Sequence, residues 1–375
     1  MSKSSDKKCL KIVFRADASI QIGTGHVMRC LTLADELTRQ GHECWFVCRE
    51  HPGHLGDLIA TKGHGLTLLP APVDVPPQQN RSASDDYASW LGVPWREDAH
   101  QTLDAISPLN PDWLVVDHYA LDSQWERTLS SAVGKVMVID DLANRPHECV
   151  LLLDQNLGRV ASDYDGLLPA ECQRLIGPRY ALLRPEFAAL REQSLKRRKN
   201  PELKRILISL GGVDRTNVTG QILTALAHSS LPTSTELDII MGASAPYLDE
   251  VRQQAAKLPF KATVSVNVRD MAERMCLADL SIGAAGSTSW ERGCLGLPAV
   301  LVVLAENQVP GAKALEAAGA ARMIGVPALV ATMLPSIFVE LSNSTWLIRM
   351  SKAAANITDG QGVFSVVSIM RTTEG

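Results

Sequence analysis

The sequence predicts an α/β protein with two doubly wound halves, each containing a parallel sheet. Apolar, β-branched runs of strand length recur along the chain. They alternate with helical patterns, which is typical of parallel strands joined by crossover helices. The alternation stops in a polar, basic stretch near residue 200 and then restarts. A length of 375 residues suffices for two domains with a core each.

The first predicted domain comprises residues 1–195. Its apolar runs predict buried strands at 11–17, 44–49, 112–119, 136–141 and 149–156. Between the first two runs, apolar residues at helical spacing lead to Gly41, which predicts a helix over 27–40. Residues 70–100 are proline-rich and then aromatic. They predict a long excursion, either a surface loop or one that covers substrate.

Residues 196–204 are predicted to be a linker and 205–375 a second α/β domain, with an interdomain hinge near residue 200. The second domain repeats the pattern of the first, with predicted strands at 205–212, 237–243, 262–268, 278–286 and 298–307. Beyond residue 330 further helical patterns follow. The terminal helix can pack back on the first domain.

Composition and net charge limit the kinds of molecule that this protein is expected to bind. The net charge of −4 leaves no basic footprint for nucleic acid or for an anionic membrane surface. No segment has the length and apolarity of a membrane span, and the N-terminus lacks a signal-peptide core, so a cytoplasmic protein is expected. Cys44, Cys48, His51 and His54 share one window, but without a closed zinc-type spacing. We expect no metal and no cofactor.

Polar residues stand where several predicted strands end, and in open α/β sheets ligands bind at these ends. In the first half they are Asp17 with the loop 23–26, and residues 117–119, 140–141 and 154–156. In the second half they are residues 211–214, 286–288 and 306–308. The two sets of strand ends are expected to surround one cleft.

The stretch Gly23-Thr24-Gly25-His26 opens the first predicted helix. Its glycines allow close approach of a ligand to the backbone, and free N–H groups at a helix start favour an anion. It is neither a dinucleotide fingerprint nor a P-loop, because the third glycine and the Lys-Ser/Thr pair are missing. Phosphate binding, chemistry at His26 and a plain tight turn all remain open at this point.

A second loop, Gly286-Ser287-Thr288, also links a predicted strand to a helix. Its N–H and hydroxyl groups can bind a diphosphate, and Glu291 one turn later can accept hydrogen bonds from ribose hydroxyls. The structural alternative is that Ser287 or Thr288 caps the helix and Glu291 is an exposed first-turn acid. The loop at Gly212 is another phosphate-sized turn after a strand.

For the other histidines, fewer features of the sequence indicate a catalytic role. His118 lies at a strand end and is either structural or catalytic. Five others occupy polar loop contexts and are expected to be solvated: His42, His51, His54, His64 and His147.

Several ordered motifs resemble the UDP-sugar hydrolases of the pseudaminic acid pathway, which act on UDP-2,4-diacetamido-2,4,6-trideoxy-β-L-altropyranose. They are FRADASIQIGTGHVMRCLTLADEL, VVDHYALD, IDDLANRPHECVLLLDQNLGR, GPRYALLRPEF, ISLGGVD, GAAGSTSWERGCLGLPAV and VVLAENQ, and they run from about residue 12 to 310. The second half also resembles, more distantly, the peptidoglycan N-acetylglucosaminyltransferase. The resemblance implies a GT-B type fold, with two doubly wound Rossmann-like domains facing a central cleft.

The resemblance also implies an activity, namely metal-free replacement of UDP by water at the anomeric carbon, with inversion. His26 matches the catalytic histidine and would take the proton of the attacking water, a task that suits an imidazole near neutral pH. Tyr119, Val268, Glu291, Asn307 and Gln308 match substrate-contacting positions of these families. The predicted substrate-binding set also includes loop residues, namely Gly25, Gly212, Gly286, Ser287 and Thr288. Asp17 either orients His26 or binds substrate directly.

The partner implied is a small UDP-sugar, handled by a bacterial, cytoplasmic monomer that serves glycosylation of flagellin or of a surface polysaccharide. Two alternatives are a GT-B glycosyltransferase that uses an acceptor alcohol instead of water, and a non-catalytic UDP-sugar-binding protein. The excursion at 70–100 and the tail beyond 330 lie outside the matched motifs. They bear on which sugar is accepted.

Overall fold

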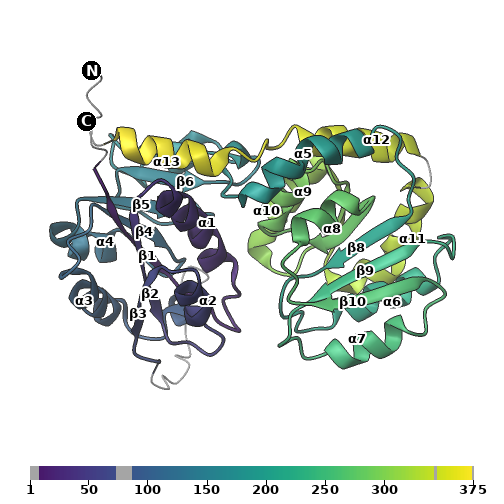
Figure 1. Cartoon of the computed structure of the whole chain (residues 1–375), viewed down its shortest axis with the longest axis horizontal. Helices are drawn as coiled ribbons and strands as arrows, with labels where there is room; N and C mark the ends of the chain where they lie inside the picture. The colour runs from purple at the N-terminus through teal and green to yellow at the C-terminus, as the bar shows by residue number, and fades with distance from the viewer. Residues whose placement is uncertain (1–7, 73–86, 342–343, 374–375) are drawn as a thin grey trace. The chain divides into compact units, whose positions relative to one another are not determined.

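The computed structural model describes residues 8–72, 87–341 and 344–373. These form two compact units, each a sheet flanked by helices (Figure 1). Unit 1 comprises Met1–Gln155, Arg159–Ile176 and Val363–Gly375. Unit 2 comprises Asn156–Gly158 and Gly177–Gly362.

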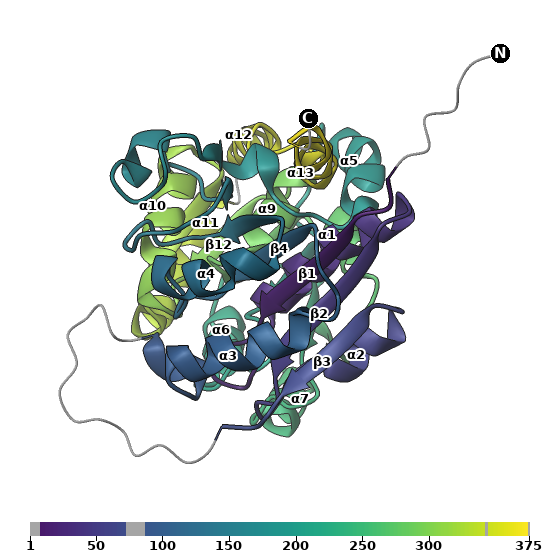
Figure 2. The same ribbon diagram turned by 90° about the vertical axis from the view of Figure 1, so that its left-hand side faces the viewer.

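Unit 1 contains a seven-stranded parallel sheet in the order β3-β2-β1-β4-β5-β6-β7. Figure 2 shows its strands β1 to β4 side by side. The strands are β1 (Lys11–Ala16), β2 (Glu43–Arg49), β3 (Gly65–Leu69), β4 (Trp113–Asp117), β5 (Lys135–Ile139), β6 (Leu151–Asp154) and β7 (Gln173–Ile176). The helices are α1 (Gly25–Arg39), α2 (Gly56–Thr61), α3 (Trp95–Ile106), α4 (Ser123–Leu129) and α13 (Gly362–Thr372).

Helix α1 shows why the local sequence folds as it does. Val27, Leu31 and Leu37 are buried along one face of it, as helical periodicity predicts. The helix ends before Gly41, whose φ of +91° is the left-handed conformation that stops a helix at low cost. The predicted helix over 27–40 therefore corresponds to α1. This helix is the next element after β1, and its first turn lies at the end of that strand.

Unit 2 contains a six-stranded parallel sheet in the order β10-β9-β8-β11-β12-β13. The strands are β8 (Arg205–Ser209), β9 (Glu236–Met241), β10 (Lys261–Val266), β11 (Leu280–Ala284), β12 (Ala299–Val302) and β13 (Ala321–Gly325). The helices are α5 (Pro185–Arg197), α6 (Val218–Ala227), α7 (Leu248–Ala255), α8 (Met271–Leu277), α9 (Thr288–Cys294), α10 (Val309–Ala317), α11 (Val330–Leu341) and α12 (Ser344–Ala355).

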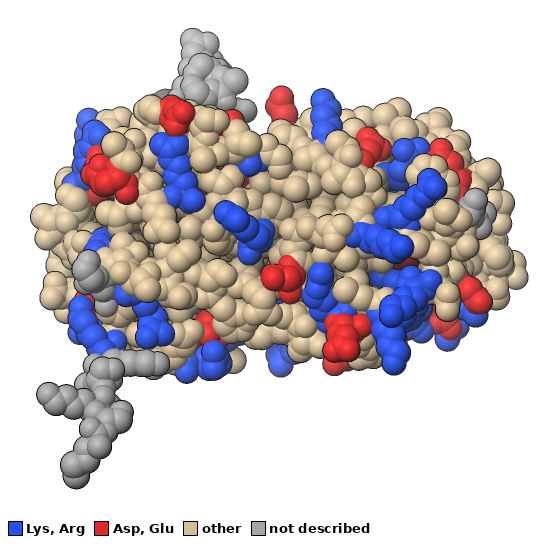
Figure 3. Space-filling view, turned by 90° about the horizontal axis from the view of Figure 1, so that it is seen from above, with Lys and Arg blue, Asp and Glu red and all other residues tan. Residues whose placement is uncertain are grey.

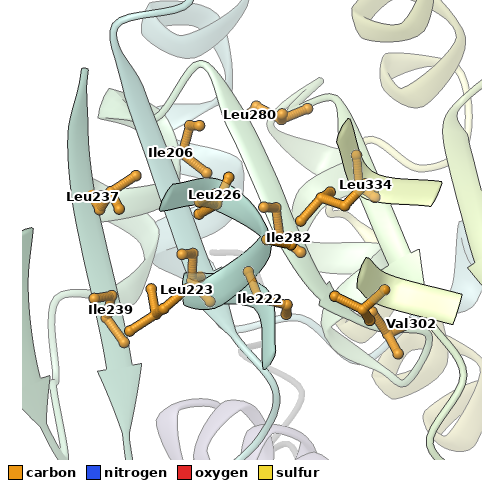
Figure 4. Packing of buried hydrophobic residues seen from close by; sticks show 14 of the residues in the cluster. Ile206, Ile222, Leu223, Leu226, Leu237, Ile239, Leu280, Ile282, Val302 and Leu334 are labelled. Atoms are coloured by element: carbon orange, nitrogen blue, oxygen red, sulfur yellow. The ribbon is translucent and has the colours of Figure 1, made fainter. Parts of the chain in front are cut away.

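The core of unit 2 lies on both faces of its sheet. On one face, Ile206, Leu237 and Ile282 of the strands pack against Leu223 of α6 and Leu334 of α11 (Figure 4). A second cluster involves α5, α8, α9 and α10. Burial on both faces explains why the central strands are continuous apolar runs in the sequence.

The predicted domain boundary is wrong in position. The predicted linker, 196–204, overlaps the end of α5, and the chain instead passes between the units at 155–159, at 176–177 and at 362–363. Two arginines of the basic stretch 190–205 bind backbone carbonyls of unit 2. Arg191 donates to Ala355 O and Thr358 O, and Arg198 donates to Met275 O and Ala278 O. Basic side chains satisfy the last carbonyls of a helix in this way, so a basic segment need not be solvated.

The last helix, α13, belongs to unit 1 from Val363 onward. Its Arg371 donates to Gln40, just beyond α1, and Lys135 of β5 donates to the carbonyl of Thr373. Most of the excursion predicted at 70–100, namely 73–86, lies outside the described residues.

No helix in the described ranges is both long and apolar enough to cross a membrane. On the face of the molecule in Figure 3, acidic and basic side chains are intermingled.

Candidate functional site

In unit 1 the sheet order reverses between β1 and its neighbour β4. Ligands of open α/β sheets bind at the carboxyl ends of the strands at such a point. His26 lies in the first turn of α1, which follows β1, and Asp117 is the last residue of β4. The sheet therefore brings together two residues that are 91 positions apart in the sequence.

The loop between β1 and α1 is a closed turn. Gly23 N donates to Ser19 O at 2.8 Å, and the Ser19 hydroxyl accepts from Ile22 N at 2.8 Å. Gly23 has φ of +83°, a conformation that a side chain would strain. A Cβ added at Gly25 would meet nothing within 4 Å, so open space lies beside the residue that begins α1.

His26 is held by Asp117, with 2.6 Å between Nδ1 and Oδ1. Burial by itself would raise the pKa of Asp117, but the Arg29 guanidinium and His26 outweigh it and hold that pKa well below its usual range. The carboxylate is therefore ionised and can only accept a hydrogen bond. It follows that Nδ1 carries the proton and that the lone pair of the neutral ring is on Nε2.

Nε2 of His26 has no hydrogen-bond partner among the residues that the structure describes. The side chain is 10% exposed. An imidazole with one nitrogen oriented by a carboxylate and the other uncommitted can accept a proton from a bound molecule.

Arg29, one turn after His26 on α1, joins two carboxylates. It donates to both oxygens of Asp117, at 2.6 Å each, and its Nη1 lies 2.8 Å from Asp141 Oδ2. The Tyr119 hydroxyl donates to the same Asp141 oxygen at 2.8 Å. Because Arg29 is 8% exposed and its two partners fix its guanidinium, the network holds both Asp117 and Tyr119 in place.

Tyr119 lies against His26. The ring centroids are 4.6 Å apart and the planes are nearly perpendicular, at 86°. Two further aromatic side chains pack on Tyr119, namely Tyr87 and Trp90.

Asp17 does not contact His26. Its Oδ1 accepts from Arg15 Nη1 at 2.7 Å and from Arg49 N at 2.6 Å, and its side chain is fully buried. Arg15 in turn pairs with Asp98 at 2.6 Å. Of the two roles predicted for Asp17, orientation of His26 is wrong, because Asp117 fills that role. Direct contact between Asp17 and substrate is not favoured either, because the Asp17 carboxylate is fully buried.

His118 is buried, and its Nε2 lies 3.3 Å from Asp17 Oδ2, which favours the structural alternative. The expectation that the loop histidines are solvated is wrong for four of the five, since His42, His51, His64 and His147 are buried. His147, for example, lies 2.7 Å from Glu126 Oε1. A carboxylate from another element lets an imidazole be buried, and a local polar context does not report such partners.

In unit 2 the sheet order reverses between β8 and β11, and a candidate loop follows each of them. Gly212 lies in the loop after β8. In the same loop, Asp214 caps α6, because its carboxylate accepts from Val218 N and Thr219 N at 2.9 and 2.8 Å. The loop after β11 contains Gly286, Ser287 and Thr288.

Among the described residues, neither the Ser287 nor the Thr288 hydroxyl has a hydrogen-bond partner. Ser287 precedes α9 without a side-chain capping bond and is exposed, which removes the capping alternative for it. Nor does the Thr288 hydroxyl have a partner within the part of the chain that the structure describes. Nε2 of Gln308 would lie 4.0 Å from a Cβ placed on Gly286, so the Gln308 amide faces this loop. Oε1 of Gln308 accepts from Leu304 N at 3.0 Å, which fixes that orientation.

Glu291 is in the first turn of α9 but is not an exposed acid. Its side chain is 17% exposed, and Oε1 lies 3.5 Å from Arg184 Nη2. Burial raises its pKa, and the charges of Arg184 and Arg292 oppose that shift. A half-enclosed carboxylate beside the uncommitted hydroxyls is placed to accept hydrogen bonds.

Two other predicted residues of unit 2 lie in the loops after β12 and β10. Asn307 is exposed in the turn after β12, next to Gln308. Val268 follows β10, the edge strand on the other side of the sheet, and its side chain packs on the core cluster with its backbone in a loop. Gly286, Ser287, Thr288 and Glu291 thus share the loop before α9 and its first turn, and Gln308 faces that loop from the turn after β12.

Sequence reasoning did not assign Asp117, Arg29, Asp141 or Arg184 to a site. Asp117 and Asp141 were visible as polar strand ends, and Arg29 follows His26 at the i+3 spacing that puts two side chains on one helix face. Arg184 lies in the motif GPRYALLRPEF, which carries part of the family resemblance but gave no role for this residue.

Comparisons with known proteins agree with this architecture. Residues 211–360 match the Glycosyltransferase family 28 C-terminal domain. The crystal structure of MurG from Acinetobacter baumannii has a TM-score of 0.66 to this chain at 18% identity, and the match covers 97% of this chain and 99% of MurG. The predicted GT-B type fold, two parallel-sheet α/β domains, is confirmed.

The predicted resemblance in sequence is confirmed as well. A UDP-2,4-diacetamido-2,4,6-trideoxy-beta-L-altropyranose hydrolase from Campylobacter jejuni is 29% identical over 267 residues, which are 71% of this chain and 81% of the relative. The spore coat polysaccharide biosynthesis protein SpsG from Bacillus subtilis is 30% identical over 199 residues, 52% of this chain and 57% of SpsG.

Proposed function

We propose that this chain, which is similar over most of its length to a UDP-sugar hydrolase, is itself an enzyme that acts on UDP-sugars. We propose further that it hydrolyses UDP-2,4-diacetamido-2,4,6-trideoxy-β-L-altropyranose to the free sugar and UDP, in pseudaminic acid biosynthesis. The observation that carries the catalytic part is the His26–Asp117 pair, whose geometry leaves Nε2 as a free base. The enzyme would act as a cytoplasmic monomer on a small-molecule substrate.

In the proposed reaction, the oxygen of a water attacks the anomeric carbon on the face opposite the diphosphate. The water proton passes to His26 Nε2, and the bond from carbon to the diphosphate oxygen breaks with its electron pair on UDP. Asp117 stabilises the imidazolium that forms, while Arg29 keeps Asp117 ionised and fixed. The configuration at the carbon inverts, and no step requires a metal.

Unit 2 would hold the UDP portion. Gly286, Ser287 and Thr288 offer backbone N–H and hydroxyl groups to the diphosphate and stabilise its growing charge as it leaves. Glu291 would accept from the ribose hydroxyls, and the backbone at Val268 would contact uracil. We assign the remaining predicted residues to the diphosphate or the sugar, namely Gly25, Gly212, Tyr119, Asn307 and Gln308.

Hydrolysis in ¹⁸O-labelled water tests the reaction type. We expect the label in the sugar and none in UDP, because attack is at carbon, and we expect the rate to survive EDTA. Mass spectrometry of both products measures this. Label in UDP would contradict attack at carbon. A requirement for an acceptor alcohol would instead favour a glycosyltransferase, and binding without turnover would favour a UDP-sugar-binding protein.

The Glu291→Ala variant tests the ribose contact. We expect its affinity for UDP, measured by titration calorimetry, to fall roughly 10-fold or more, since hydrogen bonds to a charged acceptor are worth about 1.5–3 kcal/mol. Glu250→Ala, in the first turn of α7, is the matched control, because that acid is exposed. Unchanged UDP affinity in Glu291→Ala would remove the residue from its proposed role.

A further inference from the structure

We propose that Trp90 is a specificity-determining residue that recognises the apolar face and methyl groups of the sugar, with Tyr87 as its support. The inference rests on the proposed function, because it names what selects the sugar at the His26 site. Trp90 belongs to the excursion that the matched motifs leave uncovered.

Trp90 is part of an aromatic cluster beside the proposed base. Its ring stacks on Tyr119 with 5.6 Å between centroids and an interplanar angle of 22°. It meets the His26 ring edge-on at 6.3 Å, and Tyr87 packs edge-on against Trp90 at 4.8 Å. Trp90 is partly exposed, whereas Tyr119 beneath it is only 8% exposed. Of the rings around His26, Trp90 therefore offers more surface to a ligand than Tyr119 does.

The fold fixes Trp90 in this position from two sides. The next residue, Leu91, and also Val93 are buried in the core that α3 and α4 form on the sheet. On the other side, Tyr119 is immobilised by its hydrogen bond to Asp141, which Arg29 also holds. A binding ring held by packing and hydrogen bonds needs little ordering when ligand arrives.

The chemistry of the proposed substrate complements such a ring. Acetamido groups replace the hydroxyls at carbons 2 and 4, and carbon 6 is a methyl group, so the sugar presents three methyl groups and few hydroxyls. Aromatic side chains bury apolar surface of this kind, and they line most small-molecule sites. A UDP-sugar with a hydroxymethyl group at carbon 6 would place a polar group against the indole. Trp90 would therefore favour the 6-deoxy, N-acetylated sugar.

The test compares wild type, Trp90→Ala and Trp90→Phe. UDP and the UDP-diacetamido-trideoxy sugar are titrated by calorimetry against each protein in the His26→Asn background, so that the sugar nucleotide is not hydrolysed during the titration. UDP release is measured without that substitution, on the same sugar and on UDP-N-acetylglucosamine. We expect Trp90→Ala to bind UDP as wild type does. The affinity advantage of the UDP-sugar over UDP should fall roughly 10-fold or more, the scale of losing a methyl-sized apolar contact. Trp90→Phe should keep most of that advantage.

Trp346→Ala, which removes a tryptophan that is 39% exposed on α12 in unit 2, is the matched control and should change neither affinity. An unchanged ratio of UDP-sugar to UDP affinity in Trp90→Ala would overturn the inference, as would an equal loss of UDP affinity in a folded protein. If the wild-type protein releases no UDP from the sugar nucleotide, the proposed hydrolysis is wrong. The ratio of UDP-sugar to UDP affinity still tests the proposed role of Trp90 in that case.

Discussion

Replacing His26 by asparagine is expected to lower the turnover of the UDP-sugar by about 10²–10⁴-fold, the usual contribution of a general base. Asparagine keeps a polar group near Asp117 but cannot take a proton from water. Binding of UDP should stay close to that of wild type, because no proposed UDP contact involves His26. Steady-state UDP release and calorimetric titration with UDP measure the two quantities.

His228→Asn is the matched control for this variant. His228 is exposed at the end of α6 in unit 2, where its ring Nδ1 lies 2.8 Å from the Thr224 carbonyl oxygen. Its replacement should leave turnover unchanged. A His26→Asn enzyme with a near-normal rate would remove His26 from its proposed role, and a parallel loss of UDP affinity would point to a misfolded site.

Replacing Asp117 by asparagine is expected to reduce both turnover and stability. The amide of the new side chain can donate to Nδ1 of His26, which moves the ring proton to Nε2 and removes the free base, a loss of roughly 10²–10⁴-fold. The change also leaves Arg29 without its buried bidentate partner, although Asp141 remains. Removal of one member of a buried ion pair typically costs about 3–5 kcal/mol. Thermal unfolding and UDP release measure the two effects.

The stability effect of Asp117→Asn has a pH signature. In wild type the pKa of Asp117 is lower in the folded state than in the unfolded chain. The stabilisation is therefore fully present above the unfolded pKa of about 4, and it is lost as pH falls toward the folded pKa. The difference in Tm between wild type and variant should stay constant from about pH 6 to 8 and shrink below about pH 4.

Asp165→Asn controls for a simple loss of charge. Asp165 is 70% exposed and pairs with Arg174 at the surface. Such a pair is worth about 0–1 kcal/mol, so Tm and turnover should barely change. Full activity in Asp117→Asn would show that His26 needs no partner to keep its tautomer.

The central strands of both sheets are visible in the sequence, because burial on both faces requires continuous apolar runs. All ten predicted strands have counterparts in the structure. The unpredicted strands are β3, β7 and β13, which are all at sheet edges. Their side chains are mostly half-buried or exposed, and each of these strands has only four or five residues.

The predicted domain boundary is in the wrong place because it rests on composition alone. A basic segment without apolar runs indicates a solvated linker when only its residue types are considered. In the structure Arg191 and Arg198 reach the carbonyls that end the helices of unit 2. These carbonyls are contributed by residues about 80 to 160 positions further along the chain, so no local pattern reveals them.

For the candidate site, local sequence was enough to find the loops. Glycines that allow a turn between a strand and a helix, with His26 or Ser287 next to them, have a local cause and leave a local signature. The residues that contact His26 and Ser287 in the folded protein leave no such local signature in the sequence. Asp117 and Asp17 both follow or end a buried strand, yet only Asp117 contacts His26, while Asp17 is enclosed with Arg15. The tertiary structure determines which carboxylate contacts His26, because the pairing of β1 with β4 places Asp117 beside the first turn of α1.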